Sequence, residues 1–296
     1  MIGSPSQFLD LLACSRCHSP LQMQNDALVC SSCKAKFEIR NGIPSFLPAA
    51  VAERFAVAQA AEEKHHAEAW TDLKVGYLPW VKSLDDYRDW LESFYRVGLT
   101  AFGFPTGFFK GKAVIEIGSG PYGMLACVPH GRGLAIDPLM PSFVAYMRDR
   151  WAENPVRVAA IGEELPARAE AFDAAVAINC LDHTMEPQKI LAELRRVLKP
   201  GAVMFINNNV KSFAGVMMGR VGERLGIARL TEVFHPHAFT GGSLAAACEE
   251  AGFEVVGQYY GKAIDPAERT RDWGWKAKLR HRVENERAMW LLARKR

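Results

Sequence analysis

The residues with the clearest chemical potential are four cysteines near the start of the chain. They form two Cys-x-x-Cys pairs, Cys14 with Cys17 and Cys30 with Cys33, with twelve residues between the pairs. Two such turns can bring four thiolates to the corners of a tetrahedron about 2.3 Å from a zinc ion. Because the protein would supply all four ligands, no position is left for substrate, and the expected zinc is structural. Redox chemistry by a Cys-x-x-Cys pair is the competing interpretation.

A second candidate site is a glycine-rich turn in the middle of the chain. Residues 112–117, Lys-Ala-Val-Ile-Glu-Ile, predict a strand, and Gly118, Gly120 and Gly123 follow it with the spacing of a dinucleotide-binding turn. Asp137 ends the next predicted strand, at the place where an acidic residue would bind a ribose. These residues alone are also compatible with an NAD-dependent dehydrogenase.

Three histidines on predicted loops are candidates for acid–base chemistry. His183 follows a strongly apolar strand, and His235 and His237 stand together in Phe-His-Pro-His. A histidine can take a proton from a hydroxyl group that reacts as a nucleophile. We expect one of His235 and His237 to contact substrate, whereas His183 can be either catalytic or a structural cap. Glu232 is the one carboxylate close to the pair in sequence, which argues against a metal site there.

The elements that must position the cysteines are short strands. Residues 21–29 alternate well enough for a hairpin, and the last ligand is followed by Phe37-Glu38-Ile39, by an Asn-Gly-Ile-Pro turn at 41–44 and by Phe46-Leu47. In these features residues 10–48 resemble the small zinc-ribbon module found as the activator subunit of several RNA and protein methyltransferases, and fused to the N-terminus of others.

The glycine turn has neighbours that together resemble class I S-adenosylmethionine-dependent methyltransferases. Glu116 precedes the glycines as in the E/D-x-G-x-G loop of that family, and a Phe-Asp pair opens the apolar strand 171–180. An amphipathic helix over 190–198 ends at Lys-Pro-Gly, before a further strand. The resemblance implies an α/β, doubly wound, Rossmann-like fold with a mostly parallel seven-stranded sheet. It also implies a closing antiparallel hairpin, for which 253–260 and 288–294 are the candidates.

The same resemblance implies roles for individual residues toward S-adenosylmethionine (SAM). Gly118 and Gly120 would let the backbone approach its methionine part, and Asp137 would accept both ribose hydroxyls. Glu116 would support the turn and approach the ammonium group. Ile161 stands where the family has an acidic residue. Further expected cofactor contacts are Gly162 and Glu163, near adenine, and Asn179.

Three parts are expected along the chain. Residues 1–48 form the zinc ribbon, 49–111 a helical connector or lid, and 112–296 the SAM-binding domain, with an insertion at about 208–237 that would hold the acceptor. Most aromatic side chains of the connector are expected to pack on the domain that follows.

Composition and charge limit the class of protein. The 296 residues are 49% hydrophobic with a net charge of +3, which fits a globular protein. Residues 269–296 hold ten Lys/Arg against three Asp/Glu, an excess of seven, which is either a solvated helix face or a contact for a phosphate-bearing partner. We see no secretory signal, no membrane span and no disulfide framework, and therefore expect a cytoplasmic location.

The sequence thus predicts a SAM-dependent methyltransferase with a structural zinc ribbon, acting on a small-molecule or saccharide acceptor at oxygen. An rRNA or tRNA nucleobase methyltransferase is the alternative within enzymes, suggested by zinc-ribbon fusions in RNA-modifying relatives and by the basic C-terminal segment. A non-catalytic scaffold that retains the cofactor fold is the alternative from another class. The acceptor and the oligomeric state are not predicted.

Overall fold

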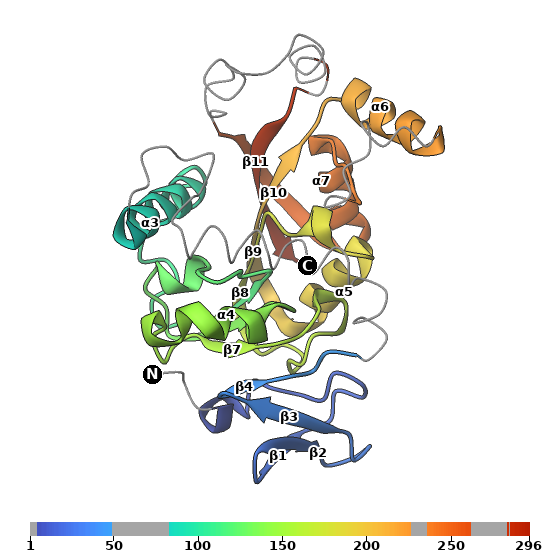
Figure 1. Ribbon diagram of the computed structural model, residues 1–296. Helices are drawn as coiled ribbons and strands as arrows, with labels where there is room; N and C mark the ends of the chain where they lie inside the picture. The colour runs from blue at the N-terminus through green and yellow to red at the C-terminus, as the bar shows by residue number, and fades with distance from the viewer. Residues whose placement is uncertain (1–4, 49–82, 226–235, 262–282, 284) are drawn as a thin grey trace.

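The computed structural model describes residues 5–48, 83–225, 236–261, 283 and 285–296. Among them, one large sheet has seven strands in the order β10-β11-β9-β8-β5-β6-β7 (Figure 1). Pairing is parallel from β9 through β7, whereas β11 runs antiparallel to both β9 and β10. The expected mostly parallel, doubly wound sheet with a closing hairpin is therefore confirmed. Its strands are β5 (Ala113–Ile117), β6 (Arg132–Ile136), β7 (Val156–Val158), β8 (Phe172–Ile178), β9 (Leu198–Val210), β10 (Phe253–Tyr260) and β11 (Arg287–Lys295).

Helices cover both faces of this sheet, which is why its central strands are apolar along nearly their whole length. The helix predicted from its amphipathic pattern is α5 (Pro187–Val197), and its buried side, which includes Ile190 and Leu194, faces the core. The other helices are α3 (Leu84–Thr100), α4 (Met140–Met147), α6 (Phe213–Arg224) and α7 (Gly241–Glu250). Short 3₁₀ turns are η1 (Pro5–Phe8), η2 (Met124–Ala126), η3 (Arg148–Arg150), η4 (Gly162–Glu164) and η5 (Leu181–His183).

The cysteine-rich segment folds into a four-stranded antiparallel sheet in the order β1-β2-β3-β4. Its strands are β1 (Leu21–Gln24), β2 (Ala27–Cys30), β3 (Lys36–Arg40) and β4 (Ile43–Pro44), so the expected hairpin over 21–29 is present. This ribbon lies beside β7, the edge strand of the large sheet (Figure 1). The N–H of Phe46 donates to the carbonyl of Ala159 at 2.8 Å, and the N–H of Ala159 donates to the carbonyl of Pro44 at 2.9 Å.

The connector contributes one described helix, α3, which packs on the large sheet. Phe94 of α3 contacts Trp290 of β11 with ring centroids 5.1 Å apart, and Leu91, Tyr95 and Leu99 are buried in the same cluster. The aromatic packing expected here is present for this helix. Trp70, Tyr77 and Trp80 lie outside the described residues, and the limits of the connector stay a prediction.

One strand boundary differs from the sequence interpretation, and the structure decides the state of part of the basic segment. Strand β9 continues through Val210, so the segment expected as an insertion from 208 departs from the sheet only after that residue. Residues 287–295 form β11, as the candidate strand 288–294 predicted, so this part of the basic segment is a strand with a mostly buried interior and not a solvated helix face. A strand is favoured because the apolar run from 288 to 293 can pair with β9 in the middle of the sheet. No helix in the described part is long and apolar enough to cross a membrane.

Candidate functional site

The two glycines after β5 have similar backbone angles but different surroundings. Gly118 has φ +64° and Gly120 has φ +57°, both in the left-handed region that favours glycine. A Cβ on Gly118 would lie 2.3 Å from the Cβ of Cys180, at the end of β8, whereas a Cβ on Gly120 would meet nothing within 4 Å. Gly118 is thus required for packing, and Gly120 leaves open space through which a ligand can approach the backbone.

Asp137 ties this turn to the end of β6. Its Oδ2 accepts a hydrogen bond from the N–H of Gly120 at 2.9 Å, and its Oδ1 accepts one from the N–H of Leu139 at 2.8 Å. The side chain belongs to a residue only 8% exposed. A carboxylate oxygen has lone pairs for more than one donor, so hydroxyl groups of a ribose could still be accepted. The position of Asp137 and its acceptor atoms therefore fit the expected role of binding a ribose.

Glu116 holds the far end of the same turn. Its Oε1 accepts from the N–H of Met124 at 2.6 Å and its Oε2 accepts from the N–H of Leu125 at 3.0 Å. Burial raises the pKa of this carboxyl to about 7, although the two N–H groups and the positive charge of Arg157 act in the opposite direction. A Cβ on Gly123 would lie 2.5 Å from Glu116 Oε2, so this glycine makes room for the carboxylate. A contact of Glu116 with the cofactor's ammonium group stays a prediction.

The remaining expected cofactor residues lie around the loop that follows β8. A Cβ on Gly162 would come within 2.9 Å of Ile190 Cδ1, so close packing on α5 explains this glycine. Glu163 Oε1 accepts from the N–H of Met185 at 2.9 Å and from the N–H of Glu186 at 3.2 Å. Asn179 is exposed at the end of β8, with φ +49°. Their contacts with adenine and cofactor stay predictions.

Of the three histidines, the structure places His237 against the same loop. Its Nε2 lies 3.0 Å from the carbonyl oxygen of Met185, and its N–H donates to the carbonyl of Asp182 at 3.3 Å. His183 ends η5, only one residue along from Asp182, and both histidine side chains are half-buried. His235 lies outside the described residues. Glu163 and His237 thus both contact the backbone of Met185. The segment predicted to contact adenine and one of the predicted bases therefore lie at the same loop.

Polar residues at the end of β9 were not anticipated. Asn207 and Asn208 are both buried, and Asn207 Nδ2 donates to the carbonyl of Met289 at 3.3 Å. Neither amide atom of Asn208 has a hydrogen-bond partner among the described residues. The run of three asparagines at 207–209, directly after an apolar strand, was the available signal. Such a run at the carboxyl end of a parallel strand marks the edge of the sheet where ligands bind.

The buried guanidinium of Arg157 was not predicted from the sequence either. Arg157 of β7 is 4% exposed and donates to the carbonyls of Ala152 and Pro155 at 3.0 and 2.9 Å. Its guanidinium carbon lies 4.6 Å from the ring centroid of Trp151, and burial lowers its pKa to about 10. The sequence shows only an arginine in a short apolar strand, where an exposed position would be the ordinary expectation.

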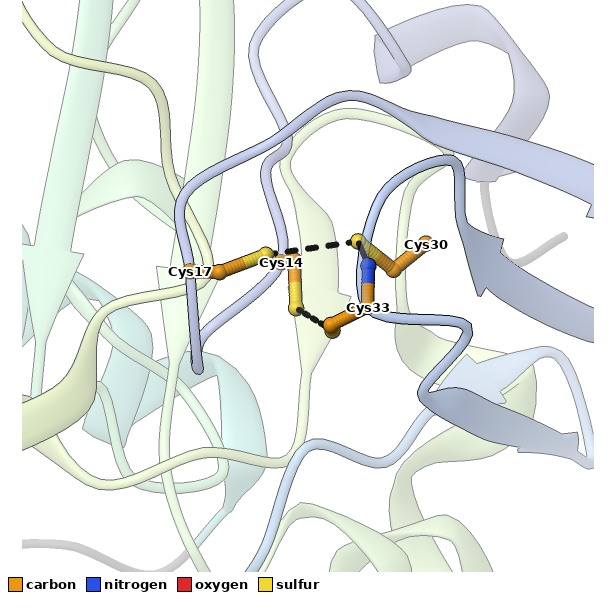
Figure 2. Close-up of side chains that lie close together, drawn as sticks. All are labelled: Cys14, Cys17, Cys30 and Cys33. Carbon is orange, nitrogen blue, oxygen red and sulfur yellow. Dashed lines mark hydrogen bonds between the residues drawn. The ribbon is translucent and has the colours of Figure 1, made fainter.

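The four cysteines of the ribbon meet at one point (Figure 2). Their sulfur atoms all lie within 4.8 Å of one another, with Sγ of Cys14 3.6 Å from Sγ of Cys33 and Sγ of Cys17 3.4 Å from Sγ of Cys30. Sulfurs at 2.3 Å from a tetrahedral metal would be about 3.8 Å apart. The donor set and its spacing therefore fit a zinc ion, and thiolates are the ligands that structural zinc prefers.

Comparison with known families agrees with both parts of the fold. Residues 115–206 match the family described as methyltransferase domain, and residues 6–42 match the family described as Trm112p-like protein. The first range contains the glycine turn, Asp137 and the loop after β8, and the second contains the four cysteines. The chain thus combines a class I methyltransferase domain with a Trm112-like module, as its sequence resemblance implied.

Curated relatives are methyltransferases. A ubiquinone biosynthesis O-methyltransferase of Paracidovorax citrulli is 28% identical over 72% of this chain and 87% of its own length. A protein of the same description from Hahella chejuensis is 32% identical over 37% of this chain, and the match spans about half of that protein, 49%. The human thiol S-methyltransferase TMT1B is 33% identical over 36% of this chain and 46% of its own length.

Solved structures share the fold. A chain from the complex between the Haloferax volcanii Trm112 methyltransferase activator and a methyltransferase aligns with a TM-score of 0.52 and 18% identity, over 81% of this chain and 96% of that one. A phosphoethanolamine N-methyltransferase of Haemonchus contortus aligns with a TM-score of 0.51 and 14% identity, over 79% of this chain and 60% of that one. At such identities the likeness concerns the fold alone.

Proposed function

We propose that this chain, a SAM-dependent methyltransferase with a Trm112-like module, transfers the methyl group to a hydroxyl oxygen of a small-molecule acceptor. The observation that carries the proposal is the hydrogen-bonded edge of the sheet. There Asp137 at the end of β6 bonds the turn after β5, a side chain on Gly120 of that turn would meet open space, and His237 is fixed against the loop after β8. The names of the O-methyltransferase relatives support oxygen as the acceptor atom.

On this proposal the turn residues hold the cofactor, and SAM supplies an electrophilic methyl group when it is bound. Gly120 leaves its backbone accessible, and Asp137 receives the ribose hydroxyls while keeping its bonds to Gly120 and Leu139. Glu116 and Gly123 fix the turn from behind. Methyl transfer depends mainly on alignment of acceptor and methyl carbon, so a turn fixed from two sides suits the reaction.

His237 is the proposed general base. A carbonyl oxygen can only accept, so its 3.0 Å contact with Met185 assigns the proton to Nε2 and leaves a lone pair on Nδ1. That lone pair can take the proton of an acceptor hydroxyl as the oxygen is methylated. His235, in the same loop, and His183, after β8, are the alternative bases.

Zinc is the proposed metal of the ribbon, with a structural role. Cys14, Cys17, Cys30 and Cys33 would hold it with no free coordination position, so no step of methyl transfer involves it. Reduced thiols are required for this site, and we therefore propose the cytoplasm as the location. A saccharide acceptor remains within the proposed class, and RNA is the rival acceptor.

The base assignment can be tested with two matched variants, His237→Ala and His183→Ala. With SAM and a panel of phenols and catechols, formation of S-adenosylhomocysteine gives kcat and KM. We expect kcat to fall about 100-fold in His237→Ala with a small change in KM, and added imidazole to restore part of it. His183→Ala should keep most of its kcat and should not respond to imidazole.

Other outcomes would redirect the proposal. A larger loss in His183→Ala, with imidazole rescue there, would assign the base to the loop after β8. Methylation of tRNA or rRNA transcripts but of no phenol or catechol, with binding that weakens steeply as salt rises, would favour the RNA alternative.

A further inference from the structure

Helix α6 carries large apolar side chains on its solvent side. Phe213, Met217, Val221 and Leu225 follow one another at intervals of four residues, so they lie along one side of the helix. Their exposed fractions are 74%, 39%, 48% and 66%. Leu225 continues the last turn, because its N–H donates to the carbonyl of Val221 at 3.0 Å. We call these four side chains the apolar stripe.

The apolar stripe is not needed to attach α6 to the domain. Gly215, Val216 and Gly222, on the opposite side of the helix, are buried. Ser212 begins the helix, and its Oγ accepts from the N–H of Gly215 at 3.0 Å. In Figure 1, α6 stands out from the body of the molecule at the upper right. Large apolar groups that are both contiguous and exposed commonly mark an interaction surface.

Positive charge borders the apolar stripe. Arg220 stands three residues after Met217 and Arg224 three residues after Val221, so each arginine neighbours the apolar stripe, and both arginines are exposed. Within α6 the sequence offers Glu223 as the only acidic residue against these two arginines. Beyond the start of the helix, Lys211 and Arg287 line a cavity of about 240 Å³.

We propose that α6 docks this enzyme on an anionic lipid surface. The apolar stripe would enter the boundary between headgroups and acyl chains, and Arg220 and Arg224 would lie at the level of the phosphates. A helix with an exposed apolar side and cationic margins binds membranes in this way. Its twelve residues make it about 18 Å long, well short of a bilayer's hydrocarbon core of about 30 Å, so it lies in the surface.

Charge argues for lipid over a second copy of this chain. A two-fold contact through the apolar stripe would bring the same surface of both copies together. Arg220 and Arg224 of one copy would then approach those of the other, and like charges at close range oppose association. Anionic headgroups complement the same arginines. Charge reversal at Arg220 and Arg224 should therefore abolish attraction to anionic lipid, whereas it would leave like charges facing one another between two copies.

Sedimentation with vesicles tests the proposal on the full-length protein. Vesicles of phosphatidylcholine alone are compared with vesicles that also contain phosphatidylglycerol. We expect binding to the anionic vesicles that falls with salt, and a loss of roughly tenfold or more in the partition coefficient of the double variant F213S/L225S. The charge variant R220E/R224E should lose binding to the anionic vesicles, with an unchanged circular dichroism spectrum.

Exposed apolar residues elsewhere supply the control. Val97 on α3 is 44% exposed and Met23 on the ribbon is 36% exposed, so V97S and M23S remove similar side chains outside α6 and should bind as the wild type does. Equal binding of wild type and F213S/L225S would overturn the proposal. A second result would also overturn it. If the wild type does not bind vesicles but forms a dimer in analytical ultracentrifugation, and F213S/L225S dissociates that dimer, the occupant is a second copy.

Discussion

At the scale of single residues, Gly118 serves the packing of the site, whereas Gly120 serves the approach of its ligand. Both require the left-handed region, but a side chain on Gly118 would enter Cys180 while one on Gly120 would enter open space. Gly201, at the opposite edge of the sheet, has φ +74° and equally open surroundings. A side chain at Gly201 would therefore meet the same backbone strain as one at Gly120, but away from the candidate cofactor site.

Alanine substitutions at these three glycines should have distinct effects. We expect Gly120→Ala and Gly201→Ala each to lower the free energy of unfolding by about 1–2 kcal/mol, and only Gly120→Ala to weaken SAM binding. Gly118→Ala should cost more stability than either, because of the clash with Cys180. Urea unfolding and titration with SAM measure both quantities. Unchanged SAM affinity in Gly120→Ala would contradict the proposed position of the cofactor.

Glu116 makes stability depend on pH in a defined direction. Burial raises its pKa from the ordinary 4.5 to about 7 in the folded chain. As pH rises between these values, the unfolded chain releases the proton first and is favoured, so this residue lowers stability by about 1.4 kcal/mol per pH unit. Below 4.5 and above 7 its contribution should be constant.

Comparison with Glu116→Gln isolates this effect. The variant keeps one acceptor for the two N–H groups, so we expect it to be less stable at low pH, with a flatter curve between pH 4.5 and 7. The difference in free energy of unfolding between wild type and variant, measured by urea denaturation across this range, should therefore shrink as pH rises. Two parallel curves would show that Glu116 does not titrate there.

The sequence predicts the residues of the turn better than their partners. Glycines, Glu116 and Asp137 stand out because they interrupt or end apolar strands. What each glycine accommodates, Cys180 at Gly118 and Glu116 at Gly123, depends on segments brought together only by the fold. The same holds for His237, whose partner Met185 is 52 residues away in sequence. No local pattern records such contacts.

At the scale of elements, the ribbon and the large sheet share a core. Leu12 is fully buried and pairs with Ala167, and Phe46 is buried beside the carbonyl of Ala159 that it bonds. Both belong to one hydrophobic cluster with Ile115 of β5. The ribbon is therefore expected to unfold together with the methyltransferase domain.

This coupling predicts one unfolding transition. Leu12→Ala should lower the free energy of unfolding by about 2–5 kcal/mol, because it opens a cavity in the shared core, and Met23→Ala, on the exposed side of β1, should change it by less than about 0.5 kcal/mol. Tryptophan fluorescence and loss of SAM binding should report the same midpoint. Two transitions, of which Leu12→Ala moves only the first, would show independent folding.

Metal removal probes the same coupling. A strong chelator should lower the melting temperature of the whole protein, because four thiolates held within 4.8 Å would otherwise repel one another or be protonated. Re-addition of Zn²⁺ should restore it, and Cys30→Ser should be insensitive to the chelator. A melting temperature unaffected by chelation, with no zinc found by elemental analysis, would contradict the structural metal.

Elements were predictable where one segment carries its own pattern. The amphipathic helix before Lys-Pro-Gly and the strand 253–260 were expected where they are found. The apolar stripe of α6 was not predicted as an exposed surface within the insertion expected at about 208–237, since periodicity predicts that a helix has an apolar side but not whether the fold covers it. Burial of that side is decided by the neighbouring elements.

At the scale of the whole molecule, the carboxyl edge of the sheet unites the proposed roles. The glycine turn, Asp137 and the loop that contacts His237 all follow the carboxyl ends of parallel strands, and α6 follows β9 at the same edge. Doubly wound sheets bind their ligands at this edge, and the sequence predicted such a sheet. The acceptor was not predictable, because it depends on loops rather than on the sheet.

Calorimetric titration of the purified protein with SAM tests the cofactor site most directly. We expect one-to-one binding by the wild type, no heat with NAD⁺, and binding about ten- to a hundredfold weaker in Asp137→Ala, which loses the acceptor for the ribose hydroxyls. Circular dichroism of the variant confirms that it is folded. Absence of SAM binding by the wild type, or equal affinity in folded Asp137→Ala, would contradict a cofactor held between the turn after β5 and the end of β6.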